Sequence, residues 1–148
     1  MKNIFESIYQ EVQKIHADYD AAKEACSEEG KNAARAEYEK LCERINEKGA
    51  AFIRIARAYR EARDKGNEHV DFHDVIWDKD VEGLITCMRE HGIEHFTFSS
   101  GWSSAVETAW LFQENGCKLE GMAEINGTCT AFMSDEYERV PAYVFSIT

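Results

Sequence analysis

Apolar residues recur with a helical period along the first part of the chain. Over residues 5–26 they are spaced alternately three and four positions apart, which places them on one side of a helix. A second stripe covers residues 34–62 and skips one position beside Gly49, where we expect the helix to bend or break. The pattern predicts an antiparallel hairpin of long helices over residues 1–66.

The heptad-like spacing of these stripes is typical of helices that pack along a seam. The seam could lie within the hairpin, against the rest of the chain, or between two copies. A homodimer through the helical hairpin is therefore one of the interpretations that the pattern leaves open.

Residues 67–148 alternate between strand and helix patterns, and Asn126-Gly127 is the strongest hairpin-turn signal among them. The predicted elements are, in order, strand 70–77, helix 78–92, strand 93–99, helix 104–116, and strands 117–126, 128–133 and 142–147. The sequence therefore predicts an α+β (α/β-like) fold, in which the helical hairpin precedes a small mixed-sheet β-α-β-α-β-β-β domain. The boundary between the two parts is expected at residues 66/67.

The segment FTFSSGWSSAVETAW, at residues 96–110, joins a predicted strand to a predicted helix. In α/β sheets such a crossing often binds anions or small ligands, because free amides and the helix dipole point at it. The residues that would form this site are Ser99, Ser100, Gly101, Trp102 and Ser103. Gly101 would permit a tight turn, and Trp102 could stack on a ring of the ligand.

A purely structural interpretation of the same segment is also available. Ser104 and Glu107 fit the capping box S-x-x-E, and Trp110 falls on the side of the helix that we expect to face the core. Neither a P-loop lysine nor G-x-S-x-G is present. A serine nucleophile would need a base from elsewhere in the fold, for which the candidates are His73, His91 and His95. We expect no complete catalytic constellation and no cofactor.

His69, Asp71 and His73 alternate along a predicted strand, so they point to one side of it. Two imidazoles and a carboxylate could hold a transition metal with open coordination positions. The alternative is that these three side chains lie on an outer face in water, while Val70 and Phe72 face the core.

Charge is distributed unevenly along the chain, whose formal net charge is −11. Residues 67–148 hold 4 Lys and Arg against 15 Asp and Glu. Such a surface repels nucleic acids and anionic membranes, so we expect neither as a direct partner. It would suit a basic protein partner, imitate DNA, or simply keep the protein soluble.

The cysteines indicate a reducing compartment. There are 5 of them, an odd number, and no CxxC pair occurs, so we expect reduced and mostly buried thiols. The first residues carry acids where a secretory signal would need an apolar stretch, which favours a cytoplasmic location.

The stretches FHDVIWDKD and FTFSSGWSSAVETAWLFQENGCKLEG resemble an uncharacterised family of small proteins from anaerobic gut bacteria, often encoded near mobile-element genes. The resemblance covers most of the chain and is strongest over residues 72–125. It implies no activity, cofactor or catalytic residue, and its genomic context favours an inhibitor or accessory factor.

Two functions remain open from the sequence. One is a non-enzymatic interaction or regulatory module with an acidic surface, of which a DNA mimic is a special case. The other is a ligand-binding domain or small enzyme that uses residues 99–104, which we call the serine-rich loop, with Glu107 or a nearby histidine as acid or base.

Overall fold

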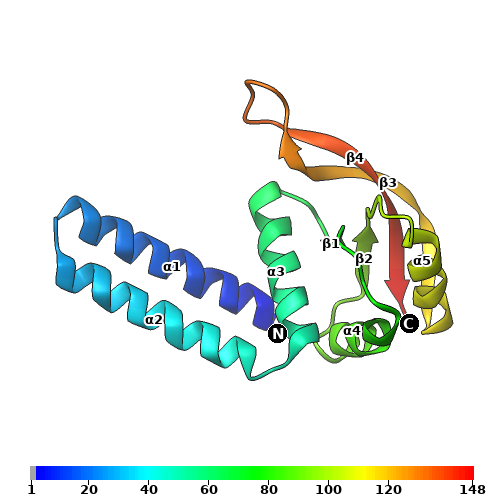
Figure 1. Ribbon diagram of the computed structural model, residues 1–148, viewed down its shortest axis with the longest axis horizontal. Coiled ribbons are helices and arrows are strands. Elements are labelled where there is room, and N and C mark those ends of the chain that lie inside the picture. The colour runs from blue at the N-terminus through cyan, green and yellow to red at the C-terminus, as the bar shows by residue number, and fades with distance from the viewer. Residues whose placement is uncertain (1–2) are drawn as a thin grey trace. The chain divides into compact units, whose positions relative to one another are not determined.

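A computed structural model describes residues 3–148 (Figure 1). It divides into two compact units, Met1–Ala56 and Arg57–Thr148, so the division falls earlier than the expected 66/67. The elements are α1 (Ile4–Glu24), α2 (Glu28–Asn46), α3 (Ala50–Lys65), β1 (Val70–Phe72), α4 (Asp78–Glu90), β2 (His95–Phe98), α5 (Ala105–Glu114), β3 (Cys117–Thr130) and β4 (Tyr137–Ile147).

In the first unit, α1 and α2 lie side by side as an antiparallel hairpin (Figure 1). Their buried seam consists of Val12, Ile15, Ala34 and Leu41. The first apolar stripe therefore packs on the part of the second stripe that lies on α2. The hairpin ends at Asn46 and not at residue 66, because the rest of the second stripe belongs to the separate helix α3. A homodimer through this hairpin stays a prediction.

The two helices approach each other closely near their connection. Ser27 caps α2 by accepting a hydrogen bond at its Oγ from the amide of Gly30, 3.0 Å away. A Cβ atom on Gly30 would lie only 2.8 Å from the Cβ of Ala22 on α1. Glycine at this position lets the helices come together without a clash.

The expected interruption beside Gly49 is a complete break. α2 ends at Asn46, α3 begins at Ala50, and Gly49 adopts a φ of +94°. This left-handed conformation favours glycine and ends an α-helix.

The second unit contains a four-stranded sheet in the order β1-β2-β4-β3. β1 and β2 are parallel, whereas β4 is antiparallel to both β2 and β3. The predicted α+β class with a mixed sheet is confirmed.

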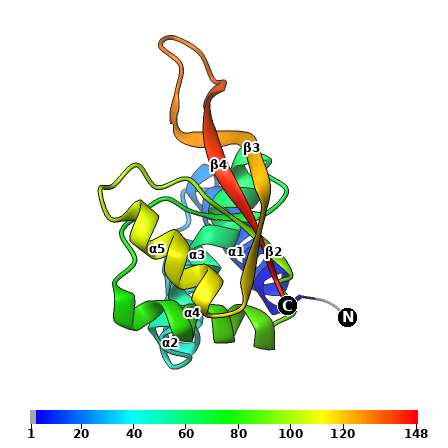
Figure 2. The same ribbon diagram turned by 90° about the vertical axis from the view of Figure 1, so that its right-hand side faces the viewer.

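The core of the second unit is a cluster of phenylalanines between α5 and the sheet. The ring of Phe112 on α5 lies 5.0 Å from Phe96, 5.2 Å from Phe98 and 5.3 Å from Phe145 (centroid distances). α4 packs beside α5 and buries Val81, Leu84, Ile85 and Met88 (Figure 2). These contacts fix which side of α5 faces the sheet.

The Asn126-Gly127 pair does not form the expected turn, because β3 continues through it to Thr130. Gly127 is buried, and a Cβ atom there would lie 2.9 Å from Cγ1 of Val140. The side-chain amide of Asn126 donates to the carbonyl of Lys65 at 2.7 Å. Gly127 thus permits the close approach of β3 to Val140 on β4, and Asn126 links β3 to Lys65. The chain reverses between Ala131 and Glu136 instead. The separate strand expected over 128–133 is absent from the described residues.

The expectation of mostly buried cysteines is wrong. Cys117 is buried, whereas Cys42 and Cys87 are half-buried and Cys26 and Cys129 are exposed. Cys26 follows the end of a helix and Cys129 lies on an exposed stretch of β3, so neither reaches a core. Burial raises the pKa of the Cys117 thiol to about 11, against the opposing effect of Arg89.

Replacing Gly30 by alanine should lower the free energy of unfolding by about 1–3 kcal/mol, because the added methyl group meets Ala22. Gly83→Ala is the matched control, because Gly83 lies inside α4 and a methyl group added there would have nothing within 4 Å. It should raise the same quantity by about 0.5–1 kcal/mol through helix propensity. Urea unfolding followed by circular dichroism measures both, and equal stabilisation by the two substitutions would contradict the close helix contact.

Candidate functional site

The carboxyl ends of β1 and β2 lie side by side, because the two strands are parallel and Phe72 pairs with Phe98. The amide of Ser99 donates to the carbonyl of Phe72 at 3.0 Å and extends this pairing by one residue. The segments that follow the two strands, 73–77 and 99–104, therefore start at the same edge of the sheet. Ligand sites of α/β proteins are typically found at such an edge.

Asp71 joins these strands through both oxygens of its carboxylate. The Ser99 hydroxyl donates to Oδ2 at 2.6 Å, and the Thr97 hydroxyl donates to Oδ1 at 2.7 Å. Thr97 is only 2% exposed. The carboxylate is thus held on a covered face of the sheet.

Burial raises the pKa of Asp71 above its ordinary value of 3.8. The hydrogen bonds from Ser99 and Thr97 oppose this effect, as do the charges of His73 and Lys65. Desolvation prevails because it disfavours the charged form of the carboxyl more than these partners stabilise it.

The two histidines that flank β1 have different neighbours. His73 places Nε2 3.1 Å from Oε2 of Glu61 and Nδ1 3.4 Å from Oδ1 of Asp74. The ring of His69 stacks on that of His95 at 5.5 Å. Within residues 3–148, no group of three or more His, Cys, Asp or Glu side chains is arranged to hold a metal ion.

The alternative that this face lies in water is wrong for Asp71. Glu61 belongs to the last turns of α3, and its contact with His73 places those turns beside the face. Val70 and Phe72 are buried on the other side, as expected. The strand pattern alone could not show that both faces are covered.

The serine-rich loop is attached to β1 through Ser99 and has a hydrogen bond of its own between Ser100 and Trp102. Ser99 bonds to Asp71, and the Ser100 hydroxyl accepts from the amide of Trp102 at 3.3 Å. Ser103 is exposed. Gly101 has no positive φ and nothing near the position of a Cβ atom, so the tight turn expected there is not what requires glycine.

The expected capping box at α5 is not formed. Ser104 occupies the N-cap position, but its backbone is already helical, with φ −82° and ψ 0°, and its side chain makes no capping bond. The cause is the preceding turn, in which the amide of Ala105 donates to the carbonyl of Trp102 at 3.0 Å. Glu107 consequently does not have the capping role that the sequence predicts for it.

A hollow of about 530 Å³ lies where the two segments meet the starts of α4 and α5. Its lining consists of Val75, Ile76, Trp77, Asp78, Lys79, Ser104 and Glu107. None of the five loop residues that the sequence proposed as a ligand site lines it. Its two carboxylates outnumber the single ammonium group of Lys79 and disfavour an anionic ligand.

All three tryptophans of the chain are exposed: Trp77 by 65%, Trp102 by 58% and Trp110 by 59%. The core-facing side of α5 is formed by Thr108 and Phe112, so Trp110 points away from the core and its expected burial is wrong. Trp102, Val106 and Trp110 follow each other at intervals of four residues. We call Trp77, Trp102, Val106 and Trp110 the tryptophan face.

The carboxylates near the tryptophan face are not neutralised by the arginines of this unit. Arg89 donates to the carbonyls of Thr148 and Asn115, and Arg139 donates to Asn126 and to the carbonyl of Glu124. Both guanidinium groups are thus committed to oxygens other than those of Asp and Glu side chains. The negative charge of residues 67–148 remains available to a partner.

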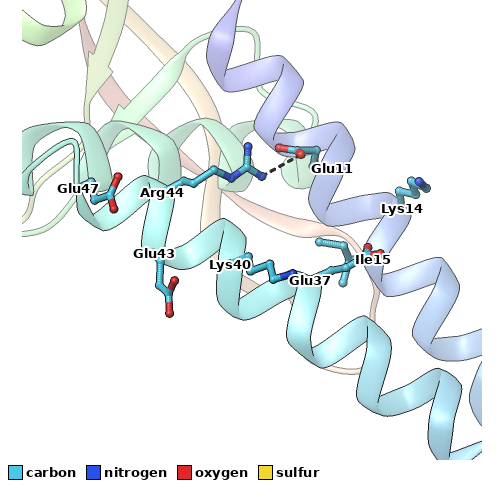
Figure 3. A pocket seen from close by; sticks show the side chains of 8 residues that line it. All are labelled: Glu11, Lys14, Ile15, Glu37, Lys40, Glu43, Arg44 and Glu47. Carbon is cyan, nitrogen blue, oxygen red and sulfur yellow. Dashed lines mark hydrogen bonds and ion pairs between the residues drawn. The ribbon is translucent and has the colours of Figure 1, made fainter.

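A second hollow of about 530 Å³ lies on the helical hairpin of the first unit (Figure 3). Seven of its eight lining residues are charged, and Ile15 is the apolar one. Arg44 and Glu11 form an ion pair across it at 3.0 Å. Charges of both signs on an exposed helix surface are typical of a solvated face, so we assign no site here.

Residues 54–147 match a family described as a domain of unknown function, DUF7698, and the chain belongs to this family. The match includes residues 72–125, over which the resemblance to an uncharacterised family is strongest. Neither a curated protein nor a solved structure matches the chain. No helix among residues 3–148 is both long and apolar enough to cross a bilayer.

The Asp71 carboxyl should titrate above pH 3.8, and Ser99→Ala should raise its midpoint further by removing a hydrogen bond to the charged form. Because the folded-state pKa lies above the unfolded value, the contribution of Asp71 to stability is largest below pH 3.8 and is lost as the pH rises through the folded pKa.

Carbon-13 NMR of the carboxyl group measures the midpoint in both proteins. Gly101→Ala is the matched control in the same loop and should leave it unchanged. A midpoint below 3.8 in the unmodified protein would show that the hydrogen bonds outweigh desolvation.

Proposed function

We propose that this member of the DUF7698 family is a non-enzymatic interaction module that binds a basic protein partner through its tryptophan face. The observation that carries the proposal is the exposure of all three tryptophans on the acidic unit. Tryptophan is costly to leave in water, and it is among the residues that dominate binding energy at protein interfaces. Large apolar side chains that stay exposed near one another commonly mark an interaction site.

Acidic side chains beside the tryptophan face define the partner's chemistry. Asp78 and Glu107 line the hollow next to Trp77 and outnumber its one cation, Lys79, and Glu114 ends α5. Lys and Arg side chains satisfy both features, since they pair with carboxylates and stack on indole rings. The partner should therefore be basic. If this partner is a nucleic-acid-binding protein, the protein described here would act as an inhibitor that imitates DNA.

The alternative function is a small-molecule site in the hollow lined by Trp77, Ser104 and Glu107. Its position at the carboxyl ends of parallel strands favours it. The carboxylates limit it to a neutral or cationic ligand with a surface that can lie on the indole of Trp77.

A short amphipathic peptide of lysine and leucine serves as a probe of the proposed interaction. It should shift the tryptophan emission to shorter wavelength, because its apolar side covers exposed indoles, and its affinity should fall as salt is added. Trp110→Ala should weaken binding about tenfold or more, since truncated tryptophans at interfaces commonly cost over about 1.4 kcal/mol. Fluorescence titration measures these effects.

Two controls accompany this titration. Tyr38→Ala removes a partly exposed aromatic residue of the first unit and should leave the affinity unchanged. A peptide in which glutamate replaces lysine should not bind. Equal binding of the two peptides, or an affinity that does not depend on ionic strength, would refute the electrostatic part of the proposal.

A native mass spectrum of gently purified protein discriminates between the two functions. The interaction module should show the mass of the chain or of a simple oligomer without an adduct. A stoichiometric adduct that is lost in Trp77→Ala but kept in Trp102→Ala would instead place a small molecule in the hollow.

A further inference from the structure

The strands β3 and β4 extend beyond the rest of the sheet. The last pair between β2 and β4 is Phe98 with Tyr143, whereas β3 and β4 continue to pair as far as Thr130 with Tyr137. Residues 123–142 therefore form a two-stranded arm, and both views show it projecting past β1 and β2 (Figures 1 and 2).

Hydrogen bonds of Asn126 tie the base of the arm to the body of its unit. The side-chain amide of Asn67 accepts from the amide of Asn126 at 2.9 Å and donates to the carbonyl of Asn126 at 3.0 Å. The side-chain amide of Asn126 also donates to the carbonyl of Lys65 at 2.7 Å, while Arg139 links the two strands of the arm by donating to Oδ1 of Asn126 at 3.0 Å. The base of the arm is thus fixed, and its end extends into solvent.

Two large apolar side chains form the end of the arm. Phe132 is 94% exposed and Met133 is 91% exposed. The turn that carries them is ordered by hydrogen bonds from Ser134 to the carbonyl of Ala131 at 3.0 Å and from Ala131 to the carbonyl of Glu136 at 2.9 Å. Their exposure is therefore a property of a defined turn.

Met133 also has an unfavourable backbone conformation. Its φ is +56°, at the third position of the turn, where glycine or asparagine is usual. The turn alone would favour a small residue at this position, and solubility alone would favour a polar one. Strain and exposed apolar surface at the same residue are typical of a functional contact.

Charge identifies the kind of partner that the tip fits. Residues 119–138 contain 5 Asp and Glu and no Lys or Arg. Anionic membranes and nucleic acids are repelled by such a segment. A second copy would bring its own net charge of −11 to the contact. The complementary surface is an apolar pocket of another protein with lysines or arginines around its rim.

We propose that Phe132 and Met133 are an anchor that inserts into an apolar, basic-rimmed pocket of a protein partner. The carboxylates of Asp135, Glu136 and Glu138 would face the rim while the two side chains enter the pocket. The anchor uses none of the residues of the tryptophan face, so it goes beyond the proposed function and can hold or fail separately.

The experiment places p-benzoylphenylalanine at position 132 of the full chain in its native cell, with position 38 as the control site. Irradiation should cross-link position 132, and not position 38, to a distinct protein that mass spectrometry identifies. That protein is then purified, and its affinity is measured by calorimetry for the unmodified chain and for variants.

The combined variant Phe132→Ala and Met133→Ala should lose at least tenfold in affinity for the cross-linked protein. Leu119→Ala with Met122→Ala removes exposed apolar side chains of β3 away from the tip and should change it less than threefold. Met133→Gly should raise the melting temperature by a few degrees while still weakening binding, which separates recognition from folding.

Each contrary result overturns the anchor. These are no cross-link at position 132, a cross-link only to a second copy, binding of the purified protein to phosphatidylglycerol vesicles that depends on Phe132, or equal affinity of the tip variant. If Trp110→Ala binds the cross-linked protein normally while the tip variant loses affinity for it, binding through the tryptophan face is refuted and the anchor is supported.

Discussion

The contact of Phe112 with three phenylalanines of the sheet determines most of what the second unit presents to solvent. Each of these rings is buried, and burying an aromatic side chain is worth about 1.5–3 kcal/mol. Rotating α5 to bury Trp110 would expose Phe112 and break all three contacts. The exposure of Trp110 is thus a consequence of better packing on the opposite side of α5.

A second set of contacts organises the covered polar face of the sheet. Asp71 accepts hydrogen bonds from two hydroxyl groups, one on the neighbouring strand and one on its extension. The side chain of Asn67 both accepts a hydrogen bond from the backbone of Asn126 and donates one to it. Both residues come from segments around β1 and reach a strand that is distant in sequence. They stabilise the positions of the strands through satisfied polar contacts.

The predictions from the sequence succeeded where local patterns decide the outcome. The helical stripes, the break at Gly49 and the alternation of strands and helices follow from periodicity and from single residues with strong preferences. The predictions that failed depend on contacts between segments that are distant in the sequence. Gly127 is used for close approach to Val140, and Trp110 is displaced from the core by Phe112.

The predictions made for the candidate site likewise succeeded in part and failed in part. The sequence located the strand-to-helix crossing correctly, but it assigned Ser104 a cap that the preceding turn prevents. Trp77 as a lining residue and the exposed tip at Phe132 were missed altogether. Two adjacent apolar residues followed by acids, in FMSDE, were the one available signal for the tip.

The strand order β1-β2-β4-β3 has a consequence for how the unit is made. β4 lies between β2 and β3, yet it follows both in the chain, so neither can join a complete sheet before β4 has been synthesised. Until then β2 and β3 have no partner along the sides that β4 later occupies, and the phenylalanine cluster lacks Phe145. The helical hairpin needs only residues near its own connection and is free to form earlier on the ribosome. Folding of the second unit is therefore expected to be a late, single step, with the unpaired edges of β2 and β3 as the vulnerable surface of the nascent chain.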